Sequence, residues 1–181
     1  MSEKYKMHNP EGMYFLTMTI VHWIDIFTRR ELSDVIVASI KHCQKEKGLV
    51  VYAWCIMSSH VHLIISSNQE KPSDIIRDLK KFTSKELVKE ISIINESRRE
   101  WLLNAFAKAG QRLHRISKNK VWQDGNRPKE LETNHFIQQK LDYIHNNPVE
   151  ARLVDEPEHY VYSSARDYAG QKGLIEVVFI E

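Results

Sequence analysis

The spacing of apolar residues along this chain alternates between two periods, one typical of strands and the other of helices. Runs rich in aromatic and β-branched residues predict buried strands at 13–21, 50–57 and 60–66. Apolar residues three and four positions apart predict amphipathic helices at 31–47 and from Pro72 onward. Only a short serine turn separates the second strand from the third, so these two strands are expected to form a hairpin.

A further helix is expected late in the chain. Thr133 or Asn134 can cap its N-terminus, and the pair Asn147-Pro148 is expected to end it, because the residue before a proline avoids the α region. The tail at 174–180 has a strand-like composition. The order strand, helix, strand, strand, helix predicts an α+β fold, a ferredoxin-like (RRM-like) sandwich with an antiparallel sheet and helices on one face, plus a C-terminal extension.

Length and composition are those of one soluble globular domain, with 181 residues, 42% hydrophobic and 28% charged. We expect a flexible N-terminal arm at 1–12, the main domain at 13–154 and an extension packed on that domain at 155–181. The chain has no apolar run of the ~20 residues that span a bilayer and no signal-like start. Cys43 and Cys55 lack metal or redox spacing. These observations favour a cytoplasmic protein over a membrane protein or a secreted disulfide scaffold.

The net charge of +2 does not indicate a class of binding partner, but several basic residues lie in two groups along the chain. One group lies on the second predicted helix and comprises Lys80, Lys81 and Lys85. The other lies in the polar segment before Val121 and comprises Arg112, Arg115, Lys118 and Lys120. Both are candidate contacts to nucleic-acid phosphates, and the alternative is a solvated helix face.

The first candidate site is the pair His60 and His62. Side chains two apart in a strand point to the same face, so these imidazoles are expected to lie side by side, with Val61 turned away. Two adjacent imidazoles can chelate one divalent cation. The alternative is a pair of partly buried histidines with local hydrogen bonds, because motifs this short also occur by chance.

The second candidate is Tyr143 with Asn147. Residues four apart share one face of a helix, so a phenol and an amide are expected to face outward together. The alternatives are an ordinary tyrosine at the edge of the core and a plain helix stop. Leu141 and Ile144 already supply the apolar stripe of this helix.

Five segments together carry a family resemblance. They are AWCIMSSHVHLIIS (53–66), LKKFTSKEL (79–87), VWQDGN (121–126), LDYIHNNPVEARLV (141–154) and YVYSSARDYAG (160–170). The sequence resembles the IS200-like single-tyrosine transposases of the HUH nuclease superfamily, and within them the REP-associated branch. The segments occur in that family's order over most of the chain.

The resemblance implies a catalytic domain over 13–154 with a ferredoxin-like palm. It implies that His60, His62 and Asn147 hold Mg²⁺ or Mn²⁺ and that Tyr143 is the nucleophile. Attack on single-stranded DNA near a hairpin or palindrome would give a 5′-phosphotyrosine and a free 3′-OH. Metal polarisation of the phosphate would assist a phenol whose ordinary pKa near 10 makes it a poor nucleophile.

This chain continues for more than thirty residues after the predicted helix that carries Tyr143. The resemblance implies that the shortest family members end soon after that helix and exchange it in dimers. We therefore expect a monomer rather than a helix-swapped homodimer. The main alternative function is a catalytically idle, domesticated relative that only binds structured DNA or RNA. A phosphodiesterase of another type would need a second histidine motif, and a purely structural α/β domain would leave the assembled motifs unexplained. Trp122 is interpreted as a core residue rather than a base-stacking one.

Overall fold

Four antiparallel strands form the centre of the fold, in the order β2-β3-β1-β4. Their bounds are β1 (Tyr14–Thr19), β2 (Leu49–Ile56), β3 (His60–Ser67) and β4 (Lys129–Glu130). This computed structural model describes residues 7–111 and 119–180. The expected hairpin joins β2 to β3, and the Met57 N–H donates to the His60 carbonyl across the turn at 2.8 Å. In the β1–β3 ladder, Thr19 lies opposite His60 and Thr17 opposite His62.

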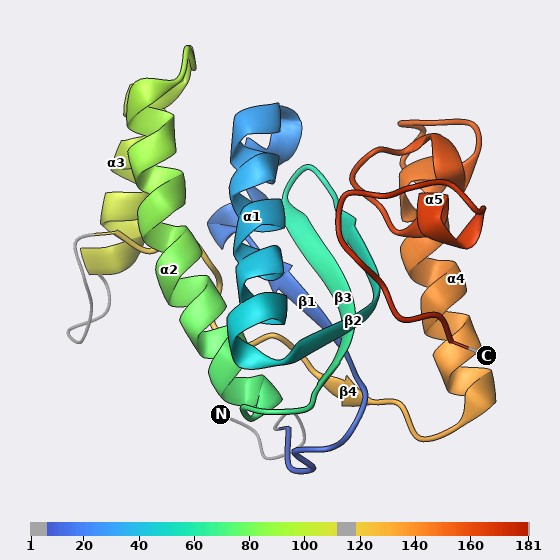
Figure 1. The fold of residues 1–181 in the computed structure, drawn as a ribbon. Coiled ribbons are helices and arrows are strands. Elements are labelled where there is room, and N and C mark those ends of the chain that lie inside the picture. Colours follow the sequence, from blue (N-terminus) through green and yellow to red (C-terminus); the bar gives the residue numbers. More distant parts are fainter. Residues whose placement is uncertain (1–6, 112–118, 181) are drawn as a thin grey trace.

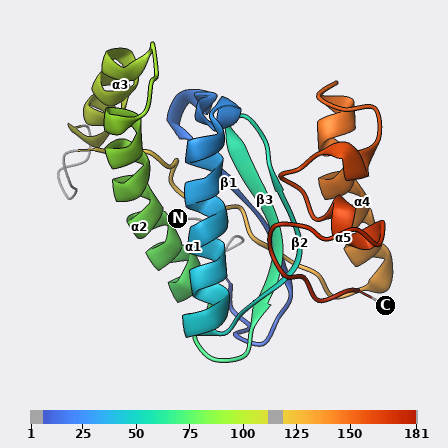
Figure 2. The same cartoon turned by 45° about the horizontal axis from the view of Figure 1, so that its top comes forward.

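One face of the sheet is covered by helices α1 (Arg30–Lys47) and α2 (Pro72–Ile93), with α3 (Arg99–Gln111) beside α2 (Figures 1 and 2). Helix α1 ends at Gly48, which adopts the left-handed conformation (φ 69°) and bonds back to the Cys43 carbonyl. The larger hydrophobic cluster fills this layer and includes Trp54, which is fully buried. These two helices lie where the sequence predicts helices on one face.

The opposite face is covered by α4 (Asn134–Glu150), which Figure 2 shows across the sheet from α1 and α2. Thr133 caps this helix as predicted, since its hydroxyl accepts from the Phe136 N–H at 3.3 Å. A smaller buried cluster joins helix to sheet, with Phe15 and Ile64 from the strands packed near Ile144 from the helix. The α+β fold and antiparallel sheet are therefore confirmed, and α4 adds a layer on the second face.

Helix α4 does not end at Asn147, contrary to the prediction from Pro148. It continues to Glu150 with Pro148 buried inside its last turn. A proline lacks one N–H, but near a C-terminus this loss affects a single hydrogen bond. The Ala151 N–H still bonds to the Asn147 carbonyl at 3.0 Å, and the Leu153 N–H bonds to the Pro148 carbonyl at 2.9 Å, so the chain keeps turning past the proline.

The C-terminal residues lie along β2, between α1 and α4 in Figure 2. They contain a 3-10 turn (Pro157–His159) and the short α5 (Ala165–Tyr168). The segment 174–180 forms no strand, although the Val178 N–H donates to the Val51 carbonyl at 2.9 Å. At the other end, residues 1–6 of the arm expected at 1–12 lie outside the described residues, and the Asn9 side-chain nitrogen donates to the Glu130 carboxylate at 2.8 Å.

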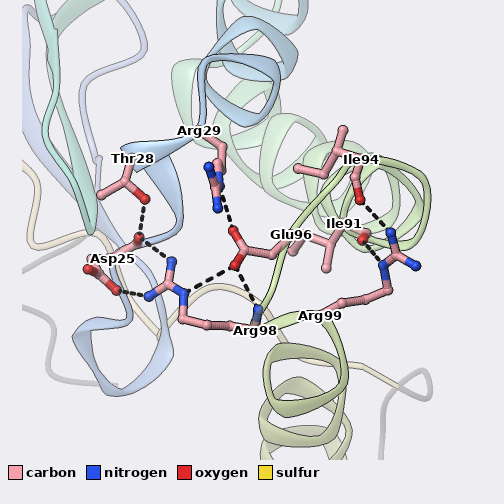
Figure 3. A network of polar contacts seen from close by, with 8 residues as sticks. All are labelled: Asp25, Thr28, Arg29, Ile91, Ile94, Glu96, Arg98 and Arg99. Carbon is pink, nitrogen blue, oxygen red and sulfur yellow. Dashed lines mark hydrogen bonds and ion pairs between the residues drawn. The ribbon is translucent and has the colours of Figure 1, made fainter.

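A buried carboxylate ties the loop after β1 to the α2–α3 connection (Figure 3). That loop contains two 3-10 turns (Val21–Trp23 and Ile26–Thr28). Glu96 accepts from Arg29 at 2.8 Å and from the Arg98 N–H at 2.8 Å, while Arg98 also pairs with Asp25 at 2.6 Å. The Arg29 bond, followed by the Arg98 N–H, lowers the pKa of Glu96 to about 2. The loop beside the end of β1 is therefore held in place.

Candidate active site

The two imidazoles at the start of β3 lie next to each other. His60 and His62 have ring centroids 4.7 Å apart with an interplanar angle of 77°. Both belong to the sheet face that α4 covers, because the intervening Val61 is buried in the cluster on the α1–α2 side. The alternation of side chains along a strand thus produces the pair expected from their spacing.

His62 is buried, with 3% of its surface exposed. Its Nδ1 lies 2.9 Å from the hydroxyl oxygen of Thr17, the residue opposite it in the β1–β3 ladder. Its Nε2 is buried and has no hydrogen-bond partner among the described residues. Burial lowers the pKa of His62 to about 3, with smaller contributions from His60 and Lys140. The ring is therefore neutral near pH 7, and the tautomer that donates from Nδ1 leaves the Nε2 lone pair free.

His60 is less buried and lies nearer the rim. Its Nδ1 is 3.1 Å from the hydroxyl of Ser59. Burial also lowers the pKa of His60, which favours the neutral, metal-binding form. Trp23 contacts the ring edge-on, with centroids 5.5 Å apart.

Tyr143 reaches the histidine pair from α4. Its ring centroid lies 5.2 Å from that of His62 and 6.0 Å from that of Phe15, both edge-on. Leu141 and Ile144 anchor the helix in the smaller cluster, which turns Tyr143 toward the end of the sheet that carries the histidines. The side chain remains 41% exposed, so a phenol beside buried imidazoles is open to a substrate.

Asn147 lies one turn after Tyr143. Its side-chain nitrogen donates to the Tyr143 carbonyl at 3.2 Å, which leaves the amide oxygen available as a ligand. In the part of the chain that the structure describes, Asn147 forms no hydrogen bond with either histidine.

Lys140 also belongs to this site and was missed by sequence reasoning. Its Nζ lies 5.1 Å from the Phe15 ring centroid and 5.4 Å from those of Phe136 and Tyr143. Burial, and then repulsion from Lys129, lowers the pKa of Lys140. The only sequence signal was its position three residues before Tyr143, on the same helix face.

The residues around the histidines form an incomplete metal site by themselves. Across residues 7–111 and 119–180, no group of three or more His, Cys, Asp or Glu side chains could hold an ion. Two neutral imidazoles with one unpartnered buried nitrogen nevertheless fit a divalent cation, with an amide oxygen and substrate oxygens as further ligands.

The predicted basic residues have different environments. Lys80 points inward, donating to the carbonyls of Gln123 (2.8 Å) and Gly125 (3.3 Å) and to the Asn126 amide oxygen (2.8 Å). Burial lowers its pKa to about 8. Lys80 thus holds the 123–126 loop, which borders β1 because the Thr17 N–H donates to the Asn126 carbonyl.

The remaining basic residues are less uniform than the sequence grouping implies. Lys81 and Lys85 are exposed on α2. Lys120 pairs with Asp124 at 2.6 Å. Three members lie outside the described residues: Arg112, Arg115 and Lys118. Trp122 is buried and its indole N–H donates to the Thr83 hydroxyl at 2.9 Å, so it is a core residue as interpreted from the sequence.

Solved structures that resemble this chain include the following two. A REP-associated tyrosine transposase bound to a REP hairpin has a TM-score of 0.64 and 18% identity, with 100% of this chain and 94% of that chain covered. A chain from Deinococcus radiodurans R1 that is described as a transposase has a TM-score of 0.45 and 17% identity, with 80% of this chain and 97% of that chain covered. A search of curated proteins found no match. None of the described helices is long and apolar enough to cross a membrane.

The family model "Transposase IS200 like" matches residues 13–108, which is more than half of the chain. The matched span contains both histidines and ends before α4. Members of this family are HUH single-tyrosine enzymes that act on DNA and typically require a metal. The chain therefore belongs to the IS200-like transposase family.

Proposed function

We propose that this protein is a metal-dependent endonuclease and strand transferase that cleaves single-stranded DNA near a hairpin or palindrome. The observation that carries the proposal is the assembly of His60, His62 and Tyr143 at one end of the sheet, with centroid distances of 4.7 and 5.2 Å. Membership of the IS200-like family supports DNA as the substrate. The hairpin bound to the REP-associated transposase of similar fold supports a structured single strand.

The metal ligands in this proposal are His60, His62 and Asn147, and the ion is Mg²⁺ or Mn²⁺. The buried, unpartnered Nε2 of His62 supports this assignment, because an isolated polar atom in the interior is otherwise costly. When bound, the ion draws negative charge from the oxygens of the scissile phosphate. The Thr17 hydroxyl orients His62 from the other side of its ring.

In the cleavage step, the Tyr143 phenol oxygen forms a bond to phosphorus and the bond from phosphorus to the 3′ oxygen breaks. The phenol proton passes to solvent and the departing oxygen takes up a proton, which gives a 5′-phosphotyrosine and a free 3′-OH. Phe15 and His62 hold the phenol ring edge-on, and Lys140 places a positive charge beside it. The phosphotyrosine conserves the energy of the broken bond, so rejoining needs no nucleotide.

Backbone phosphates of the substrate are proposed to contact the exposed Lys81 and Lys85. Arg112, Arg115 and Lys118 remain proposed contacts from the sequence. Lys80 and Lys120 have internal partners, so their role in DNA binding is to shape the 123–126 loop.

A monomer in which Tyr143 acts with the histidines of its own chain is part of the proposal. The support is the attachment of α4 to its own sheet by the C-terminal residues. His145 of α4 lies 2.9 Å from the Ser164 hydroxyl, which in turn accepts from the Trp54 N–H of β2 at 2.9 Å. Exchange of α4 between copies would require these hydrogen bonds to be made between two chains.

The test is covalent adduct formation with labelled single-stranded hairpin oligonucleotides, drawn from the palindromes beside the gene, with Mn²⁺ or Mg²⁺. Wild type is compared with Tyr143→Phe and His60→Ala on a denaturing gel. Tyr162→Phe is the matched control, because the Tyr162 hydroxyl bonds to Asp34 on the α1 side. We expect a metal-dependent DNA–protein band that is lost in Tyr143→Phe and His60→Ala and kept in Tyr162→Phe.

An adduct that persists in Tyr143→Phe would contradict the nucleophile. Binding of the hairpin with no adduct in wild type would favour the alternative of a relative that only binds DNA. No binding across the oligonucleotides would contradict the proposed function as a whole.

A further inference from the structure

A large aromatic side chain is left in solvent next to the histidine pair. Trp23 follows β1 and is 60% exposed, whereas Trp54 and Trp122 are buried. Its ring meets that of His60 edge-on, with centroids 5.5 Å apart and an interplanar angle of 74°. Trp101 on α3 is also exposed, at 55%, so what distinguishes Trp23 is its contact with His60 and not its exposure alone.

The backbone under Trp23 is strained. His22 and Trp23 have φ values of 57° and 58°, in the left-handed region that is unfavourable for non-glycine residues. Two hydrogen bonds hold the residues just before this turn: the Ile20 N–H donates to the Ser59 carbonyl at 2.9 Å and the Val21 N–H to the Val121 carbonyl at 2.8 Å. Within the turn, the Trp23 N–H donates to the Ile20 carbonyl at 3.0 Å. Such strain is retained where surrounding structure imposes it, and it concentrates at functional sites.

The same tryptophan lines a pocket of about 480 Å³. Among the described residues, the pocket is also lined by Val21, His22, Ala109, Lys120, Gln123 and Asp124. Lys120 and Asp124 of this lining are paired with each other at 2.6 Å, so the pair adds no net charge to the pocket. The lining combines apolar and aromatic side chains with polar ones, and this combination matches a nucleobase, which has an apolar face and a polar edge.

We propose that Trp23 and this pocket bind one unpaired base of the DNA strand, in the nucleotide next to the scissile phosphate. This inference rests on the proposed function, because it takes the His60–His62 pair as the position of that phosphate. Trp23 both contacts His60 and lines the pocket, so a base stacked on its ring lies within about one nucleotide of the reacting group. The strained backbone fixes the ring for this contact at no cost on binding.

The experiment moves a single abasic site along the hairpin substrate. DNA binding is measured on the Tyr143→Phe background, so that affinity is separated from adduct formation, and the adduct rate is measured with Tyr143 intact. Trp23→Ala and Trp23→Phe are compared with Trp101→Ala, an exposed tryptophan on α3 that is 55% exposed. Thermal unfolding of each variant verifies that it is folded.

We expect one abasic position beside the cleavage point to weaken binding by about tenfold, in the range known for base–aromatic stacking. Trp23→Ala should lose a similar factor on intact DNA and should be insensitive to the abasic site at that position alone. Trp23→Phe should keep much of the affinity, and Trp101→Ala should behave as its parent.

Equal responses of folded Trp23→Ala and Trp101→Ala at every abasic position would overturn the inference. If wild type forms the adduct while this occurs, the proposed function stands and the base site alone is wrong. If no adduct forms but the Trp23-dependent abasic effect is present, Trp23 binds a base, while the proposed cleavage and the place of that base beside a scissile phosphate are wrong. Absence of DNA binding by every variant would overturn both.

Discussion

The two faces of the sheet are built from the same strands but have different contents. On the side of α1 and α2, β3 contributes Val61 and Leu63, fully buried in the larger cluster. On the side of α4, the same strand contributes His60, His62 and then Ile64. The apolar layer on this face therefore reaches Ile64 and does not include the first residues of β3. The face under α1 and α2 thus contributes mainly to stability. The face under α4 carries two imidazoles at one end, where apolar side chains would otherwise pack.

Two histidines on the α4 side sharpen this contrast. Burial lowers the pKa of His62 to about 3 and that of His145 to about 4. The Nε2 of His145 is 2.9 Å from the Ser164 hydroxyl, whereas that of His62 is the buried nitrogen without a partner. Both rings therefore have a lowered pKa. The difference is that the Nε2 of His62 has no hydrogen-bond partner among the described residues, which makes His62 the candidate ligand and His145 a structural residue.

The largest effect is expected from the core itself. Leu63→Ala should reduce the free energy of unfolding by about 2–5 kcal/mol, because it leaves a cavity in the larger cluster. Ile64→Ala, in the smaller cluster under α4, should cost less, because that layer can relax more easily. Denaturant unfolding measures both. A larger loss for Ile64→Ala would show that the α4 face contributes more to stability than its composition indicates.

The next effect separates His62 from His145. His62→Asn should slow metal-dependent adduct formation by at least about 100-fold, since polarisation by the ion contributes several kcal/mol. His145→Asn should keep the adduct and lose stability, because it breaks the bond to Ser164. Adduct rates at several Mn²⁺ concentrations check this pair of variants. Equal loss of activity in both would remove the distinction drawn from the unpartnered nitrogen.

His62 and His145 should make the stability of the fold depend on pH in the same direction. Each has a folded-state pKa well below its ordinary value of 6.5, so the unfolded chain binds more protons and stability falls as the pH falls below about 6.5. Each ring should contribute a slope of up to about 1.4 kcal/mol per pH unit, and either Asn variant should remove its own share. Unfolding between pH 6 and 5 with a chelator present measures this slope. An unchanged slope in His62→Asn would contradict its neutral, buried state.

The smallest predicted effect belongs to Lys140. Lys140→Met retains an apolar contact with Phe15 and removes the charge beside Tyr143. We expect the adduct rate to fall by about fivefold to tenfold, a modest change because the site is partly open to water. Lys140→Arg should restore most of the rate. A rate unaffected by Lys140→Met would leave this lysine a packing role only.

The sequence pattern predicted the features that depend on residues close together along the chain. Period-two spacing placed His60 and His62 together, and the helical repeat placed Tyr143 and Asn147 one turn apart. The pattern could not show β4, because that two-residue strand depends on pairing with Tyr14 and Phe15 across more than a hundred positions.

The features that the sequence did not predict depend on contacts with segments far away along the chain. Lys80 belonged by sequence to a basic surface, yet the 123–126 loop folds over it and takes all three of its N–H groups. Pro148 was expected to stop α4, but tertiary packing buries its ring inside the helix. Trp23 carried no sequence signal because its exposure depends on the left-handed turn under it.

The Glu96 network has a consequence for the timing of folding. Its bonds join Arg29 to Glu96 and Asp25 to Arg98, residues 67 and 73 positions apart along the chain. These ion pairs can form only once the elements between their members have assembled, so we expect them to form late, after the barrier to folding. Interactions absent at the barrier slow unfolding without speeding folding. We therefore expect the network to lengthen the lifetime of the folded loop that presents Trp23 while leaving the rate of its formation nearly unchanged.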